Sequence, residues 1–240
     1  MGKLFVIGVG IGNIDDLTVK ADRIIRSSDF VYCDEKMFQK MRLYYDINKL
    51  IPNDYTKTTT RCINAINQAK ESDLVSILGS GDTGIYGIAG IVLDKIDEMN
   101  VDIDVEIIPG MTSAILGSSL LGSPITKDFA VITLSDHFVN KEEFEQKIKN
   151  IVTSDLSIVF YSPSNPTKEN LIKAKEILLK YRDSKTLVGI TNNIGNDDQN
   201  IIITNLEEFD LSFVNSLSTI FIGNNDTHLT RTRKMVTKLY

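Results

Sequence analysis

Short apolar runs rich in β-branched residues alternate with stretches of helical periodicity through the first half of the chain. Such alternation predicts a mostly parallel sheet covered by helices, because parallel neighbours need a long crossover between them. Ligands of these sheets bind at the carboxyl ends of the strands, so site residues are expected in the loops that follow the runs. The runs are residues 3–8, 29–34, 73–79 and 102–110, and the helical patterns between them are residues 17–28, 62–72 and 85–100.

The segment 109–124 is rich in glycine and serine, contains two prolines, and divides this pattern near the middle of the chain. A chain of 240 residues exceeds a common single-domain size. We therefore predict two α/β domains, residues 1–112 and 113–240, joined within this segment. Beyond it, apolar runs recur at 128–134, 156–162, 186–192, 200–204 and 217–223, with helical stretches at 140–152 and 165–182.

The composition argues against several classes of protein. A net charge of −6 disfavours nucleic-acid binding, which engages phosphates with a basic face. No apolar stretch approaches the roughly 20 residues that span a bilayer, and the first residues resemble a strand rather than a signal peptide. Cys33 and Cys62 lie far apart without a metal-ligand spacing, so no metal site is predicted. We expect a cytoplasmic enzyme with no membrane or nucleic-acid partner.

Two glycine-rich loops follow apolar runs, at residues 8–13 and 78–90. Neither contains the Gly-Lys-Ser/Thr of a phosphate-binding P-loop. The first departs from the dinucleotide fingerprint because Asn13 replaces its last glycine, although Asp34 stands near the place of a ribose-binding acid. A nicotinamide-dependent oxidoreductase therefore stays an alternative, as does simple packing of strand against helix. Glycine also lets a flat or uncharged ligand approach the backbone.

A series of motifs runs in a consistent order along the chain. They are GSGDTGIYGIAG at 79–90, IIPGMTSA at 107–114, FAVITLSD at 129–136, VFYSPS at 159–164, GITNN at 189–193, STIFIGN at 218–224 and RKMVTKLY at 233–240. Together they resemble the tetrapyrrole methylase family. Its members have two α/β domains with a cleft between them, which binds S-adenosylmethionine and a large macrocycle bearing carboxylates. The resemblance implies the same fold and cofactor here.

Within the family, the chain is most similar to the methyltransferases of cobalamin biosynthesis that act on carbon-17. The resemblance implies methylation of precorrin-3B or cobalt-factor III with contraction of the ring, by a homodimer. A family methylase acting at another ring carbon is one alternative. A binding module that keeps the cofactor fold without catalysis is another.

The resemblance assigns the cofactor to strand-end loops of both domains. Asp82 could attract the cationic part of S-adenosylmethionine or cap the helix expected to begin near Gly84. The chain departs from the family at Ser162 and Asn192, where relatives more often carry Asn-Pro-Arg and Arg-Asn-Ala, so backbone contacts are expected there. The assigned cofactor residues are Ser80, Gly81, Asp82, Ile85, Thr112, Ser113, Tyr161, Ser162, Asn193, Ile194 and Gly223.

The resemblance also implies where the macrocycle binds. Asp136 and His137 follow an expected strand and suit acid–base work during ring contraction. Asn13 stands where some relatives carry an aspartate, and an amide cannot act as the base. The assigned substrate residues are Gly10, Ile11, Gly12, Asn13 and Ser135, and Lys127, Arg231, Arg233 and Lys234 are basic residues available for the macrocycle's carboxylates.

Overall fold

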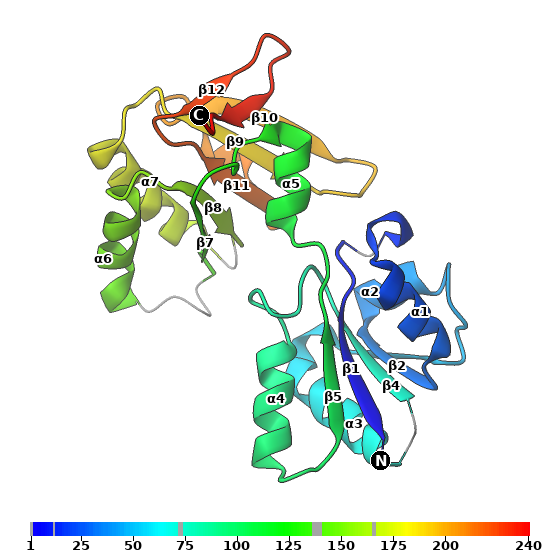
Figure 1. The fold of residues 1–240 in the computed structure, drawn as a ribbon. Coiled ribbons are helices and arrows are strands. Elements are labelled where there is room, and N and C mark those ends of the chain that lie inside the picture. The colour runs from blue at the N-terminus through cyan, green and yellow to red at the C-terminus, as the bar shows by residue number, and fades with distance from the viewer. Residues whose placement is uncertain (1, 12, 72–73, 136–140, 165–166) are drawn as a thin grey trace. The chain divides into compact units, whose positions relative to one another are not determined.

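The computed structural model describes residues 2–11, 13–71, 74–135, 141–164 and 167–240. The chain divides into two compact units, Met1–Thr112 and Ser113–Tyr240 (Figure 1). Each unit builds its own sheet and its own hydrophobic core. The helices and strands confirm the predicted α/β fold class.

The first unit is a sheet of parallel strands in the order β3-β2-β4-β1-β5. Gly8 pairs with Gly79 and Ile7 with Ile108, so β1, β4 and β5 end side by side. The glycine-rich loops leave the sheet at this carboxyl edge. The strands are β1 (Lys3–Gly8), β2 (Phe30–Asp34), β3 (Leu50–Asn53), β4 (Leu74–Gly79) and β5 (Asp104–Ile108).

Helices cover both faces of this sheet because alternate strand residues point to opposite faces. Phe5 and Ile7 of β1 pack with the core under α1 and α2, whereas Leu4 and Val6 pack with the core under α3 and α4. The helices are α1 (Val19–Ser27), α2 (Glu35–Met41), α3 (Thr58–Glu71) and α4 (Ala89–Glu98), with short 3-10 turns at η1 (Ile14–Asp16) and η2 (Tyr55–Lys57).

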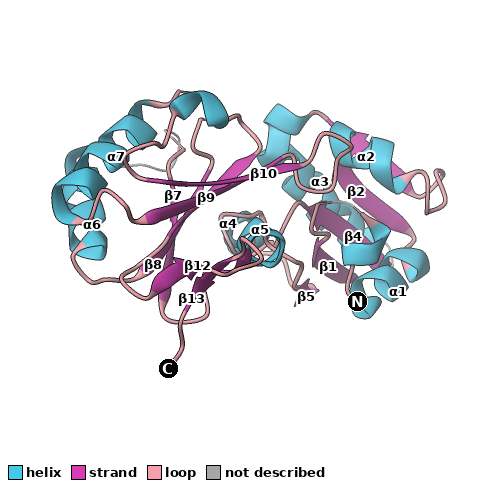
Figure 2. Cartoon of the chain, turned by 90° about the horizontal axis from the view of Figure 1, so that it is seen from above, coloured by secondary structure: helices cyan, strands magenta, loops and turns pink. Residues whose placement is uncertain are grey.

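The second unit has a mixed sheet in the order β10-β9-β11-β8-β7. β7 and β8 are parallel, and the other neighbours are antiparallel. Of these, β9 and β10 are consecutive and are joined by a short connection without an α-helix, as an antiparallel pair allows. α6 (Lys141–Val152) and α7 (Glu169–Tyr181) cover one face (Figure 2). The strands are β7 (Phe129–Thr133), β8 (Ser157–Tyr161), β9 (Leu187–Asn192), β10 (Asn200–Asn205) and β11 (Ser218–Ile222), with a 3-10 turn η3 at Leu211–Phe213.

The segment expected to link the domains is not a simple linker. It contains α5 (Ser113–Leu121), which covers the other face of the second sheet and packs with Val159, Phe221 and Met235. A three-stranded sheet of β6 (Gly122–Ser123), β12 (Thr227–Leu229) and β13 (Met235–Thr237) adjoins it. Among the residues described, no helix is long and apolar enough to cross a bilayer.

Candidate functional site

The glycine loops that follow β1 and β4 are joined by backbone hydrogen bonds. The Gly10 amide donates to the Gly81 carbonyl oxygen at 3.1 Å, and the Gly81 amide donates back to the Gly10 carbonyl oxygen at 2.6 Å. Both residues are left-handed, with φ of +59° at Gly10 and +66° at Gly81. Only glycine adopts this conformation without strain, so the two loops need glycine at these positions.

The loop after β5 packs against the same glycines. A Cβ atom placed on Gly110 would lie 2.3 Å from the Gly81 carbonyl oxygen and 2.4 Å from the Gly8 carbonyl carbon. A Cβ on Gly8 would lie 2.6 Å from the Gly110 amide nitrogen. Three backbone segments therefore meet here without room for any side chain.

Asp82 joins the second glycine loop to the loop after β5. Its Oδ1 accepts the Gly84 amide at 2.8 Å, and its Oδ2 accepts the Gly110 amide at 3.0 Å. α4 begins at Ala89 with Ile88 as its N-cap residue, so the expectation that Asp82 caps this helix is wrong. Asp82 stabilises the loop, and both of its oxygens already accept backbone hydrogens.

The same loop exposes other side chains to solvent. Ser80, Ile85 and Tyr86 are exposed, and Tyr86 is left-handed with φ of +51°. Thr83 is fully buried beneath them, and its Oγ1 has no hydrogen-bond partner. A Cβ on Gly81 would meet a single atom, Thr112 Cα at 3.9 Å, so the backbone at Gly81 is open on that side.

The loop after β1 is held by two polar side chains. Asn13 Oδ1 accepts the Asp15 amide at 3.2 Å and caps η1, which assigns its side-chain oxygen a structural role. Lys40 of α2 donates to the Ile11 carbonyl oxygen at 2.8 Å. Sequence reasoning missed Lys40, whose place beside this loop depends on α2, an unexpected helix. Gly12, also assigned to the substrate, lies outside the described residues.

Asp34 is not placed as a ribose-binding acid. It is the N-cap of α2, where its Oδ1 accepts the Met37 amide at 2.9 Å, and it is 6% exposed. Asp34 is the residue that supported a nicotinamide-dependent oxidoreductase as an alternative, and its carboxylate instead caps the start of α2. The oxidoreductase alternative therefore loses the residue that chiefly supported it.

In the second unit, strand register gathers most of the assigned residues at one edge of the sheet. Thr133 pairs with Tyr161, which places Ser135 and Ser162 just beyond the same edge, and Ser218 pairs with Asn192 at that end. The Tyr161 hydroxyl accepts the Ala114 amide at 2.8 Å, which brings the start of α5 and Ser113 to this edge. Asn193 and Ile194 follow β9 directly.

The amide side chains at this edge are used within the unit. Asn192 Nδ2 donates to Asn200 Oδ1 and to the Phe213 carbonyl oxygen, each at 3.0 Å, and Ser218 Oγ donates to Asn192 Oδ1. Asn193 Nδ2 donates to Asp198 Oδ2 at 2.7 Å. A ligand at this edge would therefore meet backbone groups more readily than these side chains.

Gly223 lies at the opposite end of the same sheet. Ile222 pairs with Ile158 near the start of β8, and the Gly223 amide donates to the carbonyl oxygen of Leu187, the first residue of β9, at 2.9 Å. A Cβ on Gly223 would lie 2.7 Å from Thr227 Cβ, which gives this glycine a packing role. The structure does not bring Gly223 together with Tyr161 and Asn193.

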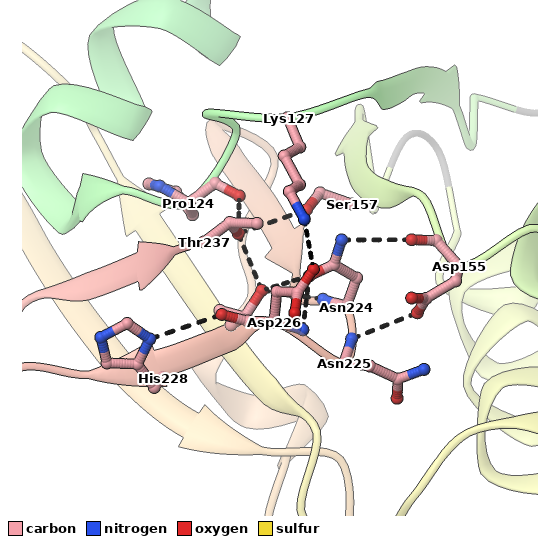
Figure 3. Close-up of polar contacts among 10 residues, drawn as sticks. Pro124, Lys127, Asp155, Ser157, Asn224, Asn225, Asp226, His228 and Thr237 are labelled. Atoms are coloured by element: carbon pink, nitrogen blue, oxygen red, sulfur yellow. Dashed lines mark hydrogen bonds and ion pairs between the residues drawn. The ribbon is translucent and has the colours of Figure 1, made fainter. Parts of the chain in front are cut away.

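The loop after β11 is fixed by a polar cluster at that far end (Figure 3). Asn224 Nδ2 donates to the Asp155 carbonyl oxygen at 3.2 Å, and Lys127 forms an ion pair with Asp226. The Lys127 ammonium lowers the pKa of Asp226. Lys127 thus has a carboxylate partner within the unit. Lys234 donates to the Leu120 carbonyl oxygen at 3.0 Å, at the end of α5 remote from Tyr161.

The candidate acid–base pair, Asp136 and His137, lies outside the described residues. Ser135, which precedes it, is 1% exposed, and its Oγ has no hydrogen-bond partner. Within the described ranges, no group of three or more His, Cys, Asp or Glu side chains could hold a metal ion.

Comparison with known proteins gives consistent matches. A family model described as tetrapyrrole (corrin/porphyrin) methylases matches residues 3–210. A protein of Methanocaldococcus jannaschii named probable cobalt-factor III C(17)-methyltransferase is 32% identical over 247 residues, covering 98% of this chain and 96% of that protein. A cobalt-factor III methyltransferase of Priestia megaterium is 31% identical over 231 residues, or 94% of this chain. The chain spans 43% of the Priestia protein, and 50% of a similar relative from Archaeoglobus fulgidus.

Solved structures show the same fold. The methyltransferase CobJ superposes with a TM-score of 0.89 at 21% identity, covering 99% of this chain and 100% of that one. A uroporphyrin-III C-methyltransferase from Thermus thermophilus, complexed with S-adenyl homocysteine, superposes with a TM-score of 0.70 at 17% identity, covering 92% and 97%. These likenesses confirm the predicted fold class.

Proposed function

This chain belongs to the tetrapyrrole (corrin/porphyrin) methylase family, and we propose that it methylates carbon-17 of precorrin-3B or cobalt-factor III with contraction of the ring. Two relatives whose names state carbon-17, from Salmonella typhimurium and Methanocaldococcus jannaschii, support this choice of ring carbon. The methyl donor is S-adenosylmethionine, the cofactor that the family uses. A family methylase acting at another ring carbon is the second candidate.

The observation that carries the cofactor assignment is the open backbone at Gly81. An exposed Ser80 precedes it, the glycine is left-handed, and a Cβ there would meet nothing closer than 3.9 Å. S-adenosylmethionine has no phosphate, so it needs neither the lysine nor the hydroxyl of a P-loop. The residues present on the first unit fit such a ligand: Ser80, Gly81, Ile85 and Thr112 would hold it there. The residues of the second unit that the resemblance assigns to the cofactor are Ser113, Tyr161, Ser162, Asn193 and Ile194.

S-adenosylmethionine supplies an already activated methyl group, so the protein mainly has to orient the acceptor carbon and exclude water. Backbone groups of the loop 80–88 would fix the cofactor, and Asp82 would hold that loop in place through Gly84 and Gly110. Gly10, Ile11 and Asn13 would line the trough for the macrocycle. Ring contraction needs proton transfer, which we assign to Asp136 and His137.

Incubation with methyl-labelled S-adenosylmethionine tests this function. Purified protein is offered precorrin-3B, cobalt-factor III and neighbouring intermediates, and the labelled methyl is located by NMR. We expect the label at carbon-17 of a contracted ring. A label at another carbon would establish the second candidate instead.

A ligand-binding comparison tests the cofactor separately. S-adenosylhomocysteine should raise the melting temperature, and NAD should leave it unchanged. Binding of S-adenosylhomocysteine without turnover of any tetrapyrrole would point to a non-catalytic module. The homodimer that the resemblance implies and the cytoplasmic location expected from the composition belong to the same proposal, and sedimentation of the purified protein checks the first of them.

A further inference from the structure

Arg61 of α3 is a buried cation whose donors are not used. It is 3% exposed, and its Nε and Nη1 are enclosed without a hydrogen-bond partner. A guanidinium is charged at any physiological pH, and burying it without a partner costs free energy. Nη2 is not among the enclosed atoms, so one corner of the guanidinium reaches the surface.

Strand register places two polar residues on the face of the sheet that α3, the helix of Arg61, covers. Asp34 and Asn53, the last residues of β2 and β3, are partners in the parallel register, so their side chains share a face of the sheet. Tyr32, two residues before Asp34, packs with the core under α3, so this is the face that α3 covers. Asn53 Oδ1 is also buried without a partner.

Both the Asp34 carboxylate and the Arg61 guanidinium act electrostatically on the buried thiol of Cys33. The pKa of Cys33 is raised to about 12, mainly by burial and in part by the Asp34 carboxylate, while the Arg61 guanidinium opposes the rise. Asp34 nevertheless forms no ion pair with Arg61, and its Oδ1 is occupied by the Met37 amide. The buried cation and the buried anion thus do not neutralise each other through an ion pair.

We propose that Arg61 binds a peripheral carboxylate of the tetrapyrrole, with Asn53 beside it. Asp34, Asn53 and the first turn of α3 lie at the carboxyl ends of β2 and β3, the same edge from which the glycine loops leave the sheet. This is the edge at which ligands of parallel sheets bind. A carboxylate supplies the acceptors that the guanidinium lacks. The inference rests on the proposed function, because it takes its ligand from it.

The test compares R61M with R42M, which removes an exposed arginine from the end of α2 in the same unit. Affinity for cobalt-factor III is measured by absorbance titration in the presence of S-adenosylhomocysteine, and stability by urea unfolding without ligand. For R61M we expect about 10- to 100-fold weaker tetrapyrrole binding, the loss of one charge-assisted contact. S-adenosylhomocysteine affinity should be unchanged, and ligand-free stability equal to or above wild type, since a buried charge is removed. R42M should match wild type.

Opposite outcomes overturn the assignment. If R61M is destabilised or does not fold, the guanidinium stabilises the fold, and if R61M binds cobalt-factor III like wild type, Arg61 does not contact the macrocycle. R61K keeps the charge without the planar fork, so its affinity should lie between those of wild type and R61M. Wild-type protein that binds S-adenosylhomocysteine but no tetrapyrrole would refute the proposed function itself, a result that the Arg61 variants do not affect.

Discussion

Replacing Gly110 with alanine tests whether the carboxyl edge of the first sheet depends on contact between backbones. The new Cβ would lie 2.3 Å from the Gly81 carbonyl oxygen and 2.4 Å from the Gly8 carbonyl carbon. Overpacking typically costs about 1–3 kcal/mol when side chains adjust. Here the neighbours are backbone atoms of two other loops, and a shift would also stretch the Gly110 hydrogen bond to Asp82. We therefore expect a loss of about 3 kcal/mol in the free energy of unfolding.

Gly90→Ala is the matched control. Gly90 lies in the first turn of α4, where a Cβ would have nothing within 4 Å, so alanine should stabilise the protein by about 0.4–1 kcal/mol. Urea unfolding followed by circular dichroism measures both variants, and calorimetry measures S-adenosylhomocysteine affinity. We expect weaker binding for G110A and unchanged binding for G90A. If G110A unfolds at the wild-type urea concentration and binds the ligand as tightly, the close packing of these loops is not what shapes the site.

Three further predictions follow from single side chains. Asp82→Ala should lower the free energy of unfolding by about 2–4 kcal/mol in urea, because the Gly84 and Gly110 amides lose a charged acceptor. Asp82→Asn should lower it by about half as much. If D82A keeps the wild-type stability but loses S-adenosylhomocysteine binding, Asp82 contacts the cofactor directly. Tyr161→Phe should cost about 1 kcal/mol, because the Ala114 amide loses its acceptor, and should weaken S-adenosylhomocysteine binding in calorimetry. Burial raises the pKa of Cys33 from 9.0 to about 12, so the stability contributed by its neutral thiol is complete below pH 9 and falls as pH rises toward 12. Urea midpoints between pH 8 and 11 should decline less steeply in Cys33→Val than in wild type, and equal slopes would contradict the assignment.

The parallel sheet of the first unit could be predicted because its core strands are apolar runs separated by long helical patterns. α2 and β3 could not, since seven and four residues are too short to show a period. β3 also contains Pro52, which an edge strand tolerates because its missing amide needs no partner. The places of Lys40 on α2 and of Asn53 on β3 therefore could not be predicted from the sequence.

α5 was missed for a different reason. Its sequence, SAILGSSLL, mixes small and apolar residues on all sides and shows no polar stripe. The structure explains the glycine within it, since a Cβ on Gly117 would lie 2.8 Å from the Phe221 ring. A helix that packs its small face on a sheet resembles a linker in sequence, because the usual contrast between apolar and polar faces is lost.

The residue types predicted where the loops at strand ends lie in the sequence. They did not determine which of these loops lie at the same edge of the sheet. β8 and β11 are antiparallel, so residues that follow them lie at opposite edges, and this separates Gly223 from Tyr161. Strand direction depends on pairing between distant segments and leaves little trace in local sequence. Asp82 shows the same limit, because the Gly110 amide that it accepts comes from a loop beyond α4.

The glycines of the first unit divide into two kinds, and this division narrows where a ligand can reach the backbone. Gly8 and Gly110 are enclosed by each other and by the Gly81 carbonyl, so no ligand atom can occupy the space a side chain would take. Gly81 is required by its left-handed φ, yet the space beside it is open. The number of glycines in a loop therefore does not show whether a ligand can reach the backbone of that loop. Of these three residues, only Gly81 combines a conformational need for glycine with an accessible backbone, and the exposed Ser80 and Ile85 lie in the same loop.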